Sequence, residues 1–280
     1  MDCPVHDDWL EAEFAVDTRL RLQVSRRLHC CRSAFQKIEV VDTPRFGRVL
    51  LLDDVINVTE QDEAVYHEML CHVPMQAHAD AQRMLVVGGG DGGIIREAVR
   101  YPGLRRAVLA EIDAEVIAAS RSWLPGVSAG LDDPRVEICT TDASAYVHGH
   151  PDTFDIIVID ATDPIGAGQR LYTPEFYRDC RRCLRANGIL TAQSESPFFD
   201  TELVTHIYTL ARKWFPLVRM YTACMPSYVS GVWSFMWCAK SPAQSHLPCR
   251  TVPAGLHYYS HEIHRAAFAL PPSIKRQFGF

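Results

Sequence analysis

The pattern of apolar and polar positions changes its period along the chain. Residues 36–42 and 48–52 have the apolar runs typical of β-strands, and the Pro and Gly of the intervening "TPRFG" predict a turn. Residues 62–76 then carry apolar side chains at helical spacing and end near Pro74, which predicts one bridging helix. A small antiparallel sheet is therefore expected ahead of the main domain.

From residue 83 onward, short apolar runs alternate with helical segments. The expected strands are "RMLVVGG", "RAVLAEID", "RVEICTTD", "FDIIVIDA" and "GILTAQSE", and the expected helices between them are "GIIREAVRY", "AEVIAASRSWL" and "PEFYRDCRRCL". A hairpin is expected within "SYVSGVWSFMWCAK", followed by a surface loop over 239–259. The pattern predicts an α/β fold, an open sheet with helices on both faces. We divide the chain into a β domain over 1–62 and a catalytic domain over 63–280.

Composition limits the partners and the location. The net charge of −6 and 22% charged residues give no basic face for nucleic acid, so none is expected as a partner. The first residues carry acids rather than the positive charge of a signal peptide, and no stretch reaches 18 uninterrupted apolar residues. We expect no membrane association, a cytoplasmic protein, and cysteines that stay as thiols.

Two sets of possible metal ligands are present, but their spacing does not support a metal site. Cys180 and Cys183 form a CxxC inside a helical pattern, and no second pair completes a zinc site. His67 and His72 are one residue too far apart for HExxH. We predict no metal from these ligands.

Acidic residues follow four successive predicted strands. Asp91 follows the first, Glu111 ends the second, Asp142 ends the third, and Asp160 and Asp163 end the fourth. Because the carboxyl ends of parallel strands meet at one edge of a sheet, where such folds bind ligands, these acids are expected to gather at one site.

The glycine loop "VVGGGDGG" carries Asp91 at its centre, and that charge restricts the ligand. GxGxxG formally matches a dinucleotide fingerprint, but a carboxylate at the helix N-terminus would repel a pyrophosphate. A nucleoside fits better, with Glu111 on the ribose hydroxyls and Asp142 accepting from an adenine amino group. The site is therefore interpreted as an adenosyl pocket.

Asp91 and Asp160 also discriminate between two forms of S-adenosylmethionine. A pocket that holds both acids attracts the ammonium of the amino-acid tail and repels its carboxylate. Two like charges about 4 Å apart cost roughly 4 kcal/mol at an effective dielectric of 20. The decarboxylated co-substrate, which has a cationic aminopropyl arm, removes this conflict.

These segments resemble the spermidine synthase (polyamine aminopropyltransferase) family. The resemblance runs from about residue 20 to 275 and is carried by "FQKIEV", "LLLDDVINVTEQDEAVYHEM", "GGGDGGIIREAV", "EID", "DATDPIG", "AQSESPFF", "PSYVSG" and "GLHYYSHEIHRAAFALP". It implies aminopropyl transfer from decarboxylated S-adenosylmethionine to a polyamine, normally putrescine, with release of 5′-methylthioadenosine. It also implies a small N-terminal β domain followed by a Rossmann-like sheet of the class I methyltransferase type, a homodimer or homotetramer, and no permanently bound cofactor.

The resemblance implies a set of site residues. The co-substrate contacts would be Gln36, His67, Asp91, Glu111, Asp142, Ala143 and Asp160. The acceptor contacts would be Asn57, Tyr66, Asp163, Gln193, Glu195 and Tyr228. The attacking amine must lose a proton, so Asp160 is expected to act as general base, with the Tyr66 hydroxyl aligning it.

Four positions depart from the family pattern. Asn57 stands where glutamine is usual, Asp54 and Ala143 stand where glycine is common, and Ala167 takes the place of a proline. The shorter Asn57 puts the acceptor in question, so cadaverine, agmatine and a triamine stay open beside putrescine. A small-molecule methyltransferase on the same fold and a non-catalytic polyamine-binding protein stay open as well.

Overall fold

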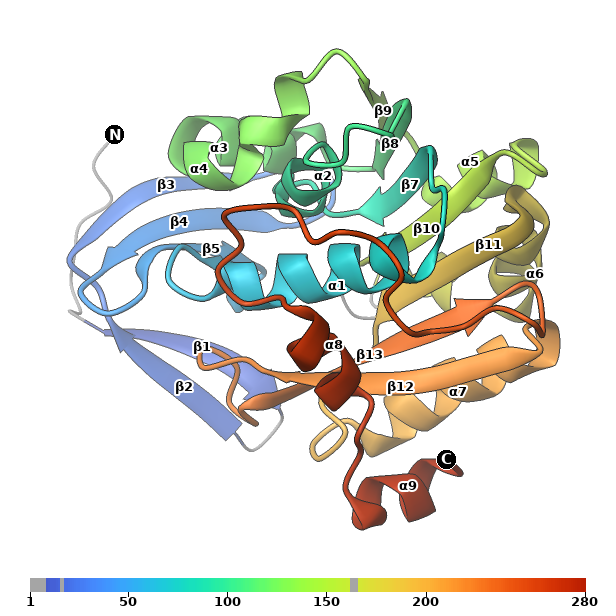
Figure 1. Cartoon of the computed structure of the whole chain (residues 1–280). Coiled ribbons are helices and arrows are strands. Elements are labelled where there is room, and N and C mark those ends of the chain that lie inside the picture. The colour runs from blue at the N-terminus through green and yellow to red at the C-terminus, as the bar shows by residue number, and fades with distance from the viewer. Residues whose placement is uncertain (1–8, 16–17, 162–165) are drawn as a thin grey trace.

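The structure is a computed structural model, and it describes residues 9–15, 18–161 and 166–280. Among these residues, strands form a two-stranded, a four-stranded and a seven-stranded sheet (Figure 1). The strands are β1 Trp9–Ala15, β2 Thr18–Gln23, β3 Arg26–Arg32, β4 Lys37–Thr43, β5 Gly47–Leu52, β6 Val55–Thr59, β7 Arg83–Gly88, β8 Arg106–Glu111, β9 Val136–Thr140, β10 Phe154–Asp160, β11 Leu184–Gln193, β12 Leu217–Cys224 and β13 Val232–Ala239. The helices are α1 Glu63–Ala77, α2 Gly93–Ala98, α3 Ala114–Trp123, α4 Pro125–Ser128, α5 Ala143–Gly149, α6 Pro174–Cys183, α7 Thr201–Trp214, α8 His261–Ala267 and α9 Pro272–Phe278, with short 3₁₀ helices η1 Ala129–Asp132 and η2 Gly166–Tyr172.

The seven-stranded sheet has the predicted mixed α/β architecture. Its order is β12-β13-β11-β10-β7-β8-β9, and the five strands from β11 to β9 run parallel. The chain leaves β7 toward β8 and β9 and later returns to β10 on the other side of β7. This reversal creates a topological switch point between β7 and β10, where ligands of open α/β sheets bind. The fold class predicted from the sequence is confirmed.

Hydrophobic clusters cover both faces of this sheet. One cluster packs α1 and α2 against it, and another packs α5, α6 and α7 against the opposite face. Cys180 and Cys183 lie buried in α6 as free thiols, as their helical pattern predicts. In the described part of the chain, no helix has the length and apolar character needed to cross a membrane.

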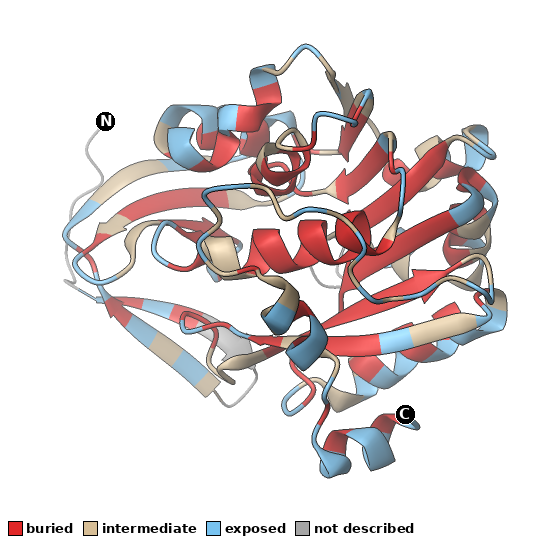
Figure 2. Ribbon diagram, in the orientation of Figure 1, coloured by how far each residue is buried: buried red, intermediate tan, exposed pale blue. Residues whose placement is uncertain are grey.

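Helix α1 lies between the four-stranded and the seven-stranded sheets and is buried along most of its length (Figure 2). It runs through Pro74 without a break and ends at Ala77, close to the predicted end. A proline inside a helix deprives the carbonyl four residues earlier of its N–H donor. Here the Thr191 hydroxyl of β11 donates to that carbonyl, the Leu70 oxygen, at 3.2 Å, so tertiary packing compensates for the proline.

The expected hairpin is displaced toward the N-terminus. Strand β13 pairs with β12, whereas residues 225–231 form the connection between them. The cause is a contact with a distant part of the chain: the backbone N–H of Ser227 donates to Asp62 Oδ2 at 2.7 Å, which holds this segment at the start of α1. Tyr228 is therefore presented from a turn rather than from a strand.

The predicted domain boundary at residue 62 stays a prediction. Buried residues from both sides of it, such as Val41, Ile56, Met69 and Leu70, belong to one hydrophobic cluster. Side chains also connect the two parts, since Arg48 donates to the Trp123 carbonyl at 2.6 Å. The β-rich segment and the main sheet thus share a core.

Candidate active site

The glycine loop after β7 is shaped by two groups that approach it closely. Gly88 has φ 74°, and a Cβ on it would lie 2.2 Å from the Asp160 carbonyl oxygen. A Cβ on Gly93 would lie 2.2 Å from His67 Nδ1. Real Cβ atoms do not approach other atoms so closely, so both positions require glycine. The loop thereby brings the ends of β7 and β10 and the start of α2 together around α1.

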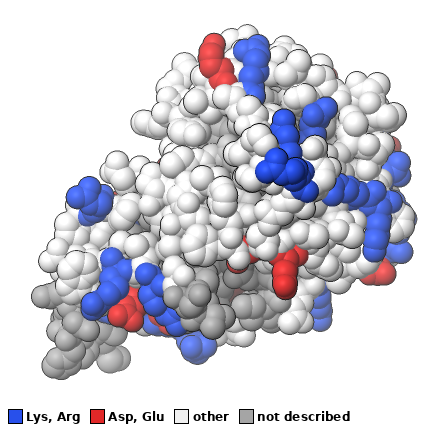
Figure 3. Space-filling view, turned by 90° about the horizontal axis from the view of Figure 1, so that it is seen from below, with Lys and Arg blue, Asp and Glu red and all other residues white. Residues whose placement is uncertain are grey.

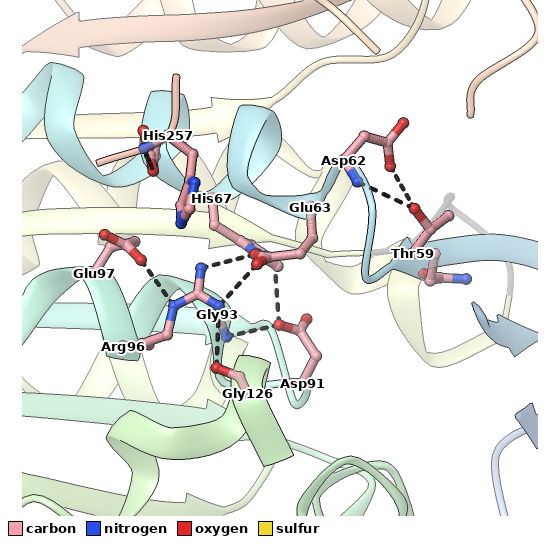
Figure 4. Close-up of polar contacts among 12 residues, drawn as sticks. Thr59, Asp62, Glu63, His67, Asp91, Gly93, Arg96, Glu97, Gly126 and His257 are labelled. Atoms are coloured by element: carbon pink, nitrogen blue, oxygen red, sulfur yellow. Dashed lines mark hydrogen bonds and ion pairs between the residues drawn. The ribbon is translucent and has the colours of Figure 1, made fainter. Parts of the chain in front are cut away.

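Asp91 points back to the start of α2 and to His67 (Figure 4). Its Oδ1 accepts the Gly93 N–H at 2.7 Å and lies 3.1 Å from His67 Nε2. Although burial alone would raise the pKa of Asp91, the His67 charge and hydrogen bond lower it. Asp91 is thus an ionised carboxylate at the place where a phosphate would otherwise bind.

His67 has a carboxylate at each ring nitrogen. Nδ1 lies 2.6 Å from Glu63 Oε2, and Nε2 faces Asp91. Burial alone would lower the pKa of His67, but the Asp91 and Glu63 carboxylates raise it to about 10. Polar atoms of His67, Asp91 and Asp160 lie within 4.8 Å of one another, a spacing that a metal ion could use. A metal needs a lone pair on the imidazole, and a ring that donates from both nitrogens has none. The cluster suits an ammonium ion better.

Asp160, at the end of β10, lies against Tyr66 of α1. The Tyr66 hydroxyl donates to Asp160 Oδ1 at 2.6 Å. Burial and the Asp91 charge raise the pKa of Asp160 to about 6. A carboxylate with a pKa near the working pH can accept a proton and later release it.

Glu111, at the end of β8, is buried beside the glycine loop. Its Oε1 accepts the Asp113 N–H at 2.8 Å, and burial raises its pKa to about 7. Gln36 reaches the same turn from the β3–β4 loop, where its amide donates to Asp113 Oδ2 at 3.0 Å. Next to this turn a hollow of about 600 Å³ opens, lined in part by Phe35, Ile112 and Asp113. The structure therefore places Glu111 and Gln36 at one end of the site.

Asp142 caps the N-terminus of α5, and Ala143 is the first residue of that helix. Asp142 Oδ1 accepts the Ser144 N–H at 2.8 Å, and Oδ2 pairs with the exposed Arg170 of η2. The Arg170 and Ser144 contacts lower the pKa of Asp142 although burial opposes them. Arg170 thus binds the carboxylate that we expect to accept a hydrogen bond from an adenine amino group. A ligand at this position would share Asp142 with Arg170.

Three of the predicted acceptor residues, Asn57, Tyr66 and Tyr228, are connected through contacts of Tyr228 with the other two. The Tyr228 hydroxyl donates to the Asn57 carbonyl at 3.0 Å, and its ring packs edge-on against Tyr66 at 6.4 Å between centroids. The Asn57 amide donates to its own strand, to the Val55 carbonyl, at 3.0 Å. The shorter side chain is therefore engaged locally.

Gln193 is the last residue of β11 and Glu195 follows two residues later, and both are buried. The Gln193 amide donates to Glu195 Oε1 at 2.6 Å and to the Ala161 carbonyl at 2.9 Å. Glu195 has φ 63°, an uncommon backbone for a residue other than glycine. Asp163, the remaining predicted acceptor contact, lies outside the described residues.

Three residues position the predicted site residues without being among them, and they were not identified from the sequence. Glu63 binds His67, Arg96 binds Glu63, and Asp62 holds the turn that carries Tyr228. Glu63 is four residues before His67, and this acid and base spacing on one predicted helix is a signal that could have found it. The partnership with Arg96 joins two helices and has no local signal.

The chain is similar to known proteins over nearly its whole length. Residues 63–247 match the spermine/spermidine synthase domain, and residues 9–60 match the spermidine synthase tetramerisation domain. The polyamine aminopropyltransferase of Moorella thermoacetica is 40% identical over 268 residues, which cover 95% of either chain. That of Desulforudis audaxviator is 42% identical over 270 residues, again 95% of either chain.

Two solved structures are similar along the full chain. A spermidine synthase in complex with the transition state analogue AdoDATO superposes with a TM-score of 0.95 at 36% identity, covering 99% of this chain and 97% of that one. The spermidine synthase from Thermotoga maritima superposes with a TM-score of 0.93 at 36% identity, covering 99% and 96%.

Proposed function

The chain belongs to the spermine/spermidine synthase family and is a polyamine aminopropyltransferase, and from that premise we propose that it makes spermidine from putrescine. The donor, as in its family, is decarboxylated S-adenosylmethionine, and the by-product is 5′-methylthioadenosine. The observation that carries the proposal is the grouping of Asp91, Asp160 and Tyr66 at the switch point of the sheet.

The donor would lie across the carboxyl ends of β7, β8 and β10. Glu111 would bind the ribose hydroxyls with Gln36 nearby, and Asp142 with Ala143 would contact the adenine. Asp91 and Asp160 would bind the aminopropyl ammonium. Both described donors to Asp91 use Oδ1, which leaves Oδ2 for this ion. A carboxylate on the ligand would meet both acids and be repelled, which favours the decarboxylated form.

The acceptor would approach Asp160 from the side of Tyr66 and Tyr228. Burial raises the pKa of both phenols well above the usual range, so they stay neutral and can orient an amine without adding charge. Gln193 and Glu195 would bind its far amine, and Asn57 would line the same end. Asp163 is proposed as a further acceptor contact on the resemblance alone.

The transfer is a displacement at carbon. The acceptor nitrogen loses a proton to Asp160, and its lone pair attacks the aminopropyl methylene next to the sulfonium. The new C–N bond forms as the C–S bond breaks, and the bonding electrons return to sulfur to give the neutral thioether. A polyamine nitrogen is protonated in water at neutral pH, so a base with a pKa near 6 is suited to the first step.

We also propose that the chain works as an oligomer. The match of residues 9–60 to a tetramerisation domain supports this, and it favours a homotetramer over the homodimer that the resemblance also allows. The cytoplasmic location stays a prediction.

A competition assay tests the reaction and the acceptor together. Purified protein would receive decarboxylated S-adenosylmethionine with putrescine, cadaverine, agmatine and spermidine at equal concentrations, and products would be identified by mass spectrometry. We expect putrescine to be consumed and the amount of spermidine to rise above the amount supplied, together with formation of methylthioadenosine. Another aminopropylated amine would support the proposed reaction but show that putrescine is not the preferred acceptor. In a parallel reaction that contains intact S-adenosylmethionine instead, a methylated amine would support the methyltransferase. Co-substrate binding without any product would support a binding protein.

A further inference from the structure

A partly buried ion pair lies against the Nδ1 side of the His67 ring. Glu63 and His67 are one turn apart on α1, and Arg96 comes from α2 (Figure 4). Two guanidinium nitrogens of Arg96 donate to the two Glu63 oxygens, each at 2.8 Å. The Glu63 side chain is 11% exposed and that of Arg96 is 17% exposed, so the pair is largely shielded from solvent.

The geometry fixes the protonation of His67. An ionised carboxylate can only accept hydrogen bonds, and His67 faces Glu63 through Nδ1 and Asp91 through Nε2. Both nitrogens must therefore carry a proton, which makes the ring an imidazolium. The ring has no room to turn toward α2, because it already touches the backbone at Gly93.

Among the described residues, titratable groups from α1, the glycine loop and β10 face the His67 ring. Glu63 and Tyr66 face it from α1, Asp91 from the glycine loop and Asp160 from β10. Arg96 acts from α2 through Glu63 and is itself shared with Glu97 at 2.8 Å. Arg96 keeps Glu63 ionised and pointed at Nδ1, so Glu63 is the group that decides whether His67 keeps its second proton.

We infer that Glu63, held by Arg96, is a positioning residue that keeps His67 as a fixed cation and so allows Asp91 and Asp160 to be ionised together. Without that cation, the two neighbouring carboxylates, of which Asp91 is buried, would share a proton. The inference rests on the proposed function for its catalytic consequence, because the two acids are the proposed ammonium site. The protonation state of His67, in contrast, does not depend on which reaction the protein catalyses.

Nuclear magnetic resonance of the imidazole nitrogens tests the structural content directly. Long-range ¹H–¹⁵N spectra of the wild-type protein, with His67→Gln used to assign the signal, should show both His67 nitrogens protonated from pH 6 to 9. A neutral His67 tautomer at pH 7.5 would overturn the inference, whatever the protein's activity. This measurement needs no substrate. It can therefore contradict the inference about His67 while the transfer assay supports the proposed function, and it can support the inference while the transfer assay contradicts that function.

Glu63→Gln tests the consequence. Gln keeps the size of the side chain and an acceptor oxygen but removes the charge, so His67 should lose a proton below pH 9. Asp160 should then hold its proton more tightly, and the acidic limb of the kcat profile should move to higher pH by about one unit. Glu202→Gln is a matched control, since Glu202 also lies in the first turn of a helix but is exposed. A uniform loss of kcat with an unchanged pH profile would mean that Glu63 has only a structural role.

Discussion

Asp160 is the residue at which the proposed chemistry concentrates. It combines burial, a tyrosine hydroxyl at 2.6 Å and a neighbouring carboxylate, and its pKa is raised to about 6. A general base must be deprotonated to act, so kcat/KM should rise as pH increases through about 6 and level off above it. A steady-state pH profile with the donor saturating and the acceptor varied checks this.

Replacing the base should remove most of the activity. Asp160→Asn keeps the shape and an acceptor for Tyr66 but cannot take up a proton, so kcat should fall by about 10²- to 10⁴-fold. Calorimetric binding of methylthioadenosine serves as the control, because the adenosyl end of the site would be intact. Turnover within a few-fold of wild type would show that another group accepts the proton.

Asp91 should discriminate between two ligands that differ in one charged arm. Asp91→Asn keeps an oxygen for the Gly93 and His67 contacts but loses the partner of the aminopropyl ammonium. The affinity for decarboxylated S-adenosylmethionine should fall by about tenfold to a hundredfold, the size of a lost charged hydrogen bond. Methylthioadenosine lacks the arm and should bind almost unchanged. Equal losses for the two ligands in titration calorimetry would refute the role.

At the scale of elements, the site depends on how α1 approaches the glycine loop. His67 of α1 lies so close to α2 that only a glycine fits at position 93. Helix α1 continues through Pro74 because the Thr191 hydroxyl of β11 donates to the Leu70 carbonyl, which lacks a donor from the proline. Contacts between elements, rather than local propensity, therefore set the distance between Asp91, His67 and Asp160.

This close packing predicts opposite results for two helix glycines. Gly93→Ala should push His67 away, lower kcat at least about tenfold and reduce the free energy of unfolding by about 1–3 kcal/mol, as overpacking does. Gly126 lies in α4 with nothing within 4 Å of a Cβ, so Gly126→Ala should be neutral or stabilise by up to about 1 kcal/mol. Chemical denaturation of both variants measures the difference. Wild-type stability and activity for Gly93→Ala would contradict the packing described here.

At the scale of the whole molecule, the sequence predicted the features that follow from a periodic pattern of apolar residues. It did not predict single contacts between residues that are far apart in sequence. Strand periodicity and the acids at strand ends were enough for the α/β sheet and for the grouping of Asp91 and Asp160. The helix over 62–76 was predicted, but the position of the hairpin and the Thr191 hydroxyl that supports α1 at Pro74 could not be, because each depends on a hydrogen bond between distant parts of the chain. The ion pair of Arg96 with Glu63 was not predicted for the same reason, because the two residues are 33 positions apart in sequence.

Association is the property of the whole molecule that the isolated chain leaves open. Residues 9–60 match a tetramerisation domain, and within them Trp9 of the β1–β2 hairpin is 46% exposed. On the face seen from below, a broad area shows no Lys, Arg, Asp or Glu side chain (Figure 3). A tryptophan buried in an interface often contributes at least about 2 kcal/mol to binding.

We therefore expect light scattering during gel filtration to give a mass near four times the 31.5 kDa of one chain. Trp9→Ser should shift the mass toward dimers or monomers, because it removes the largest exposed apolar group of the hairpin. Leu247→Ser is the matched control: Leu247 is 49% exposed but lies in the loop after β13, outside the tetramerisation match, and its loss should leave the mass unchanged. A monomeric wild-type protein would reject assembly outright, whereas a tetramer that tolerates Trp9→Ser would place the contact elsewhere in residues 9–60. Since Gln36 belongs to that same segment and reaches the donor end of the site through Asp113, dissociation that also weakens donor binding would show that assembly supports the site.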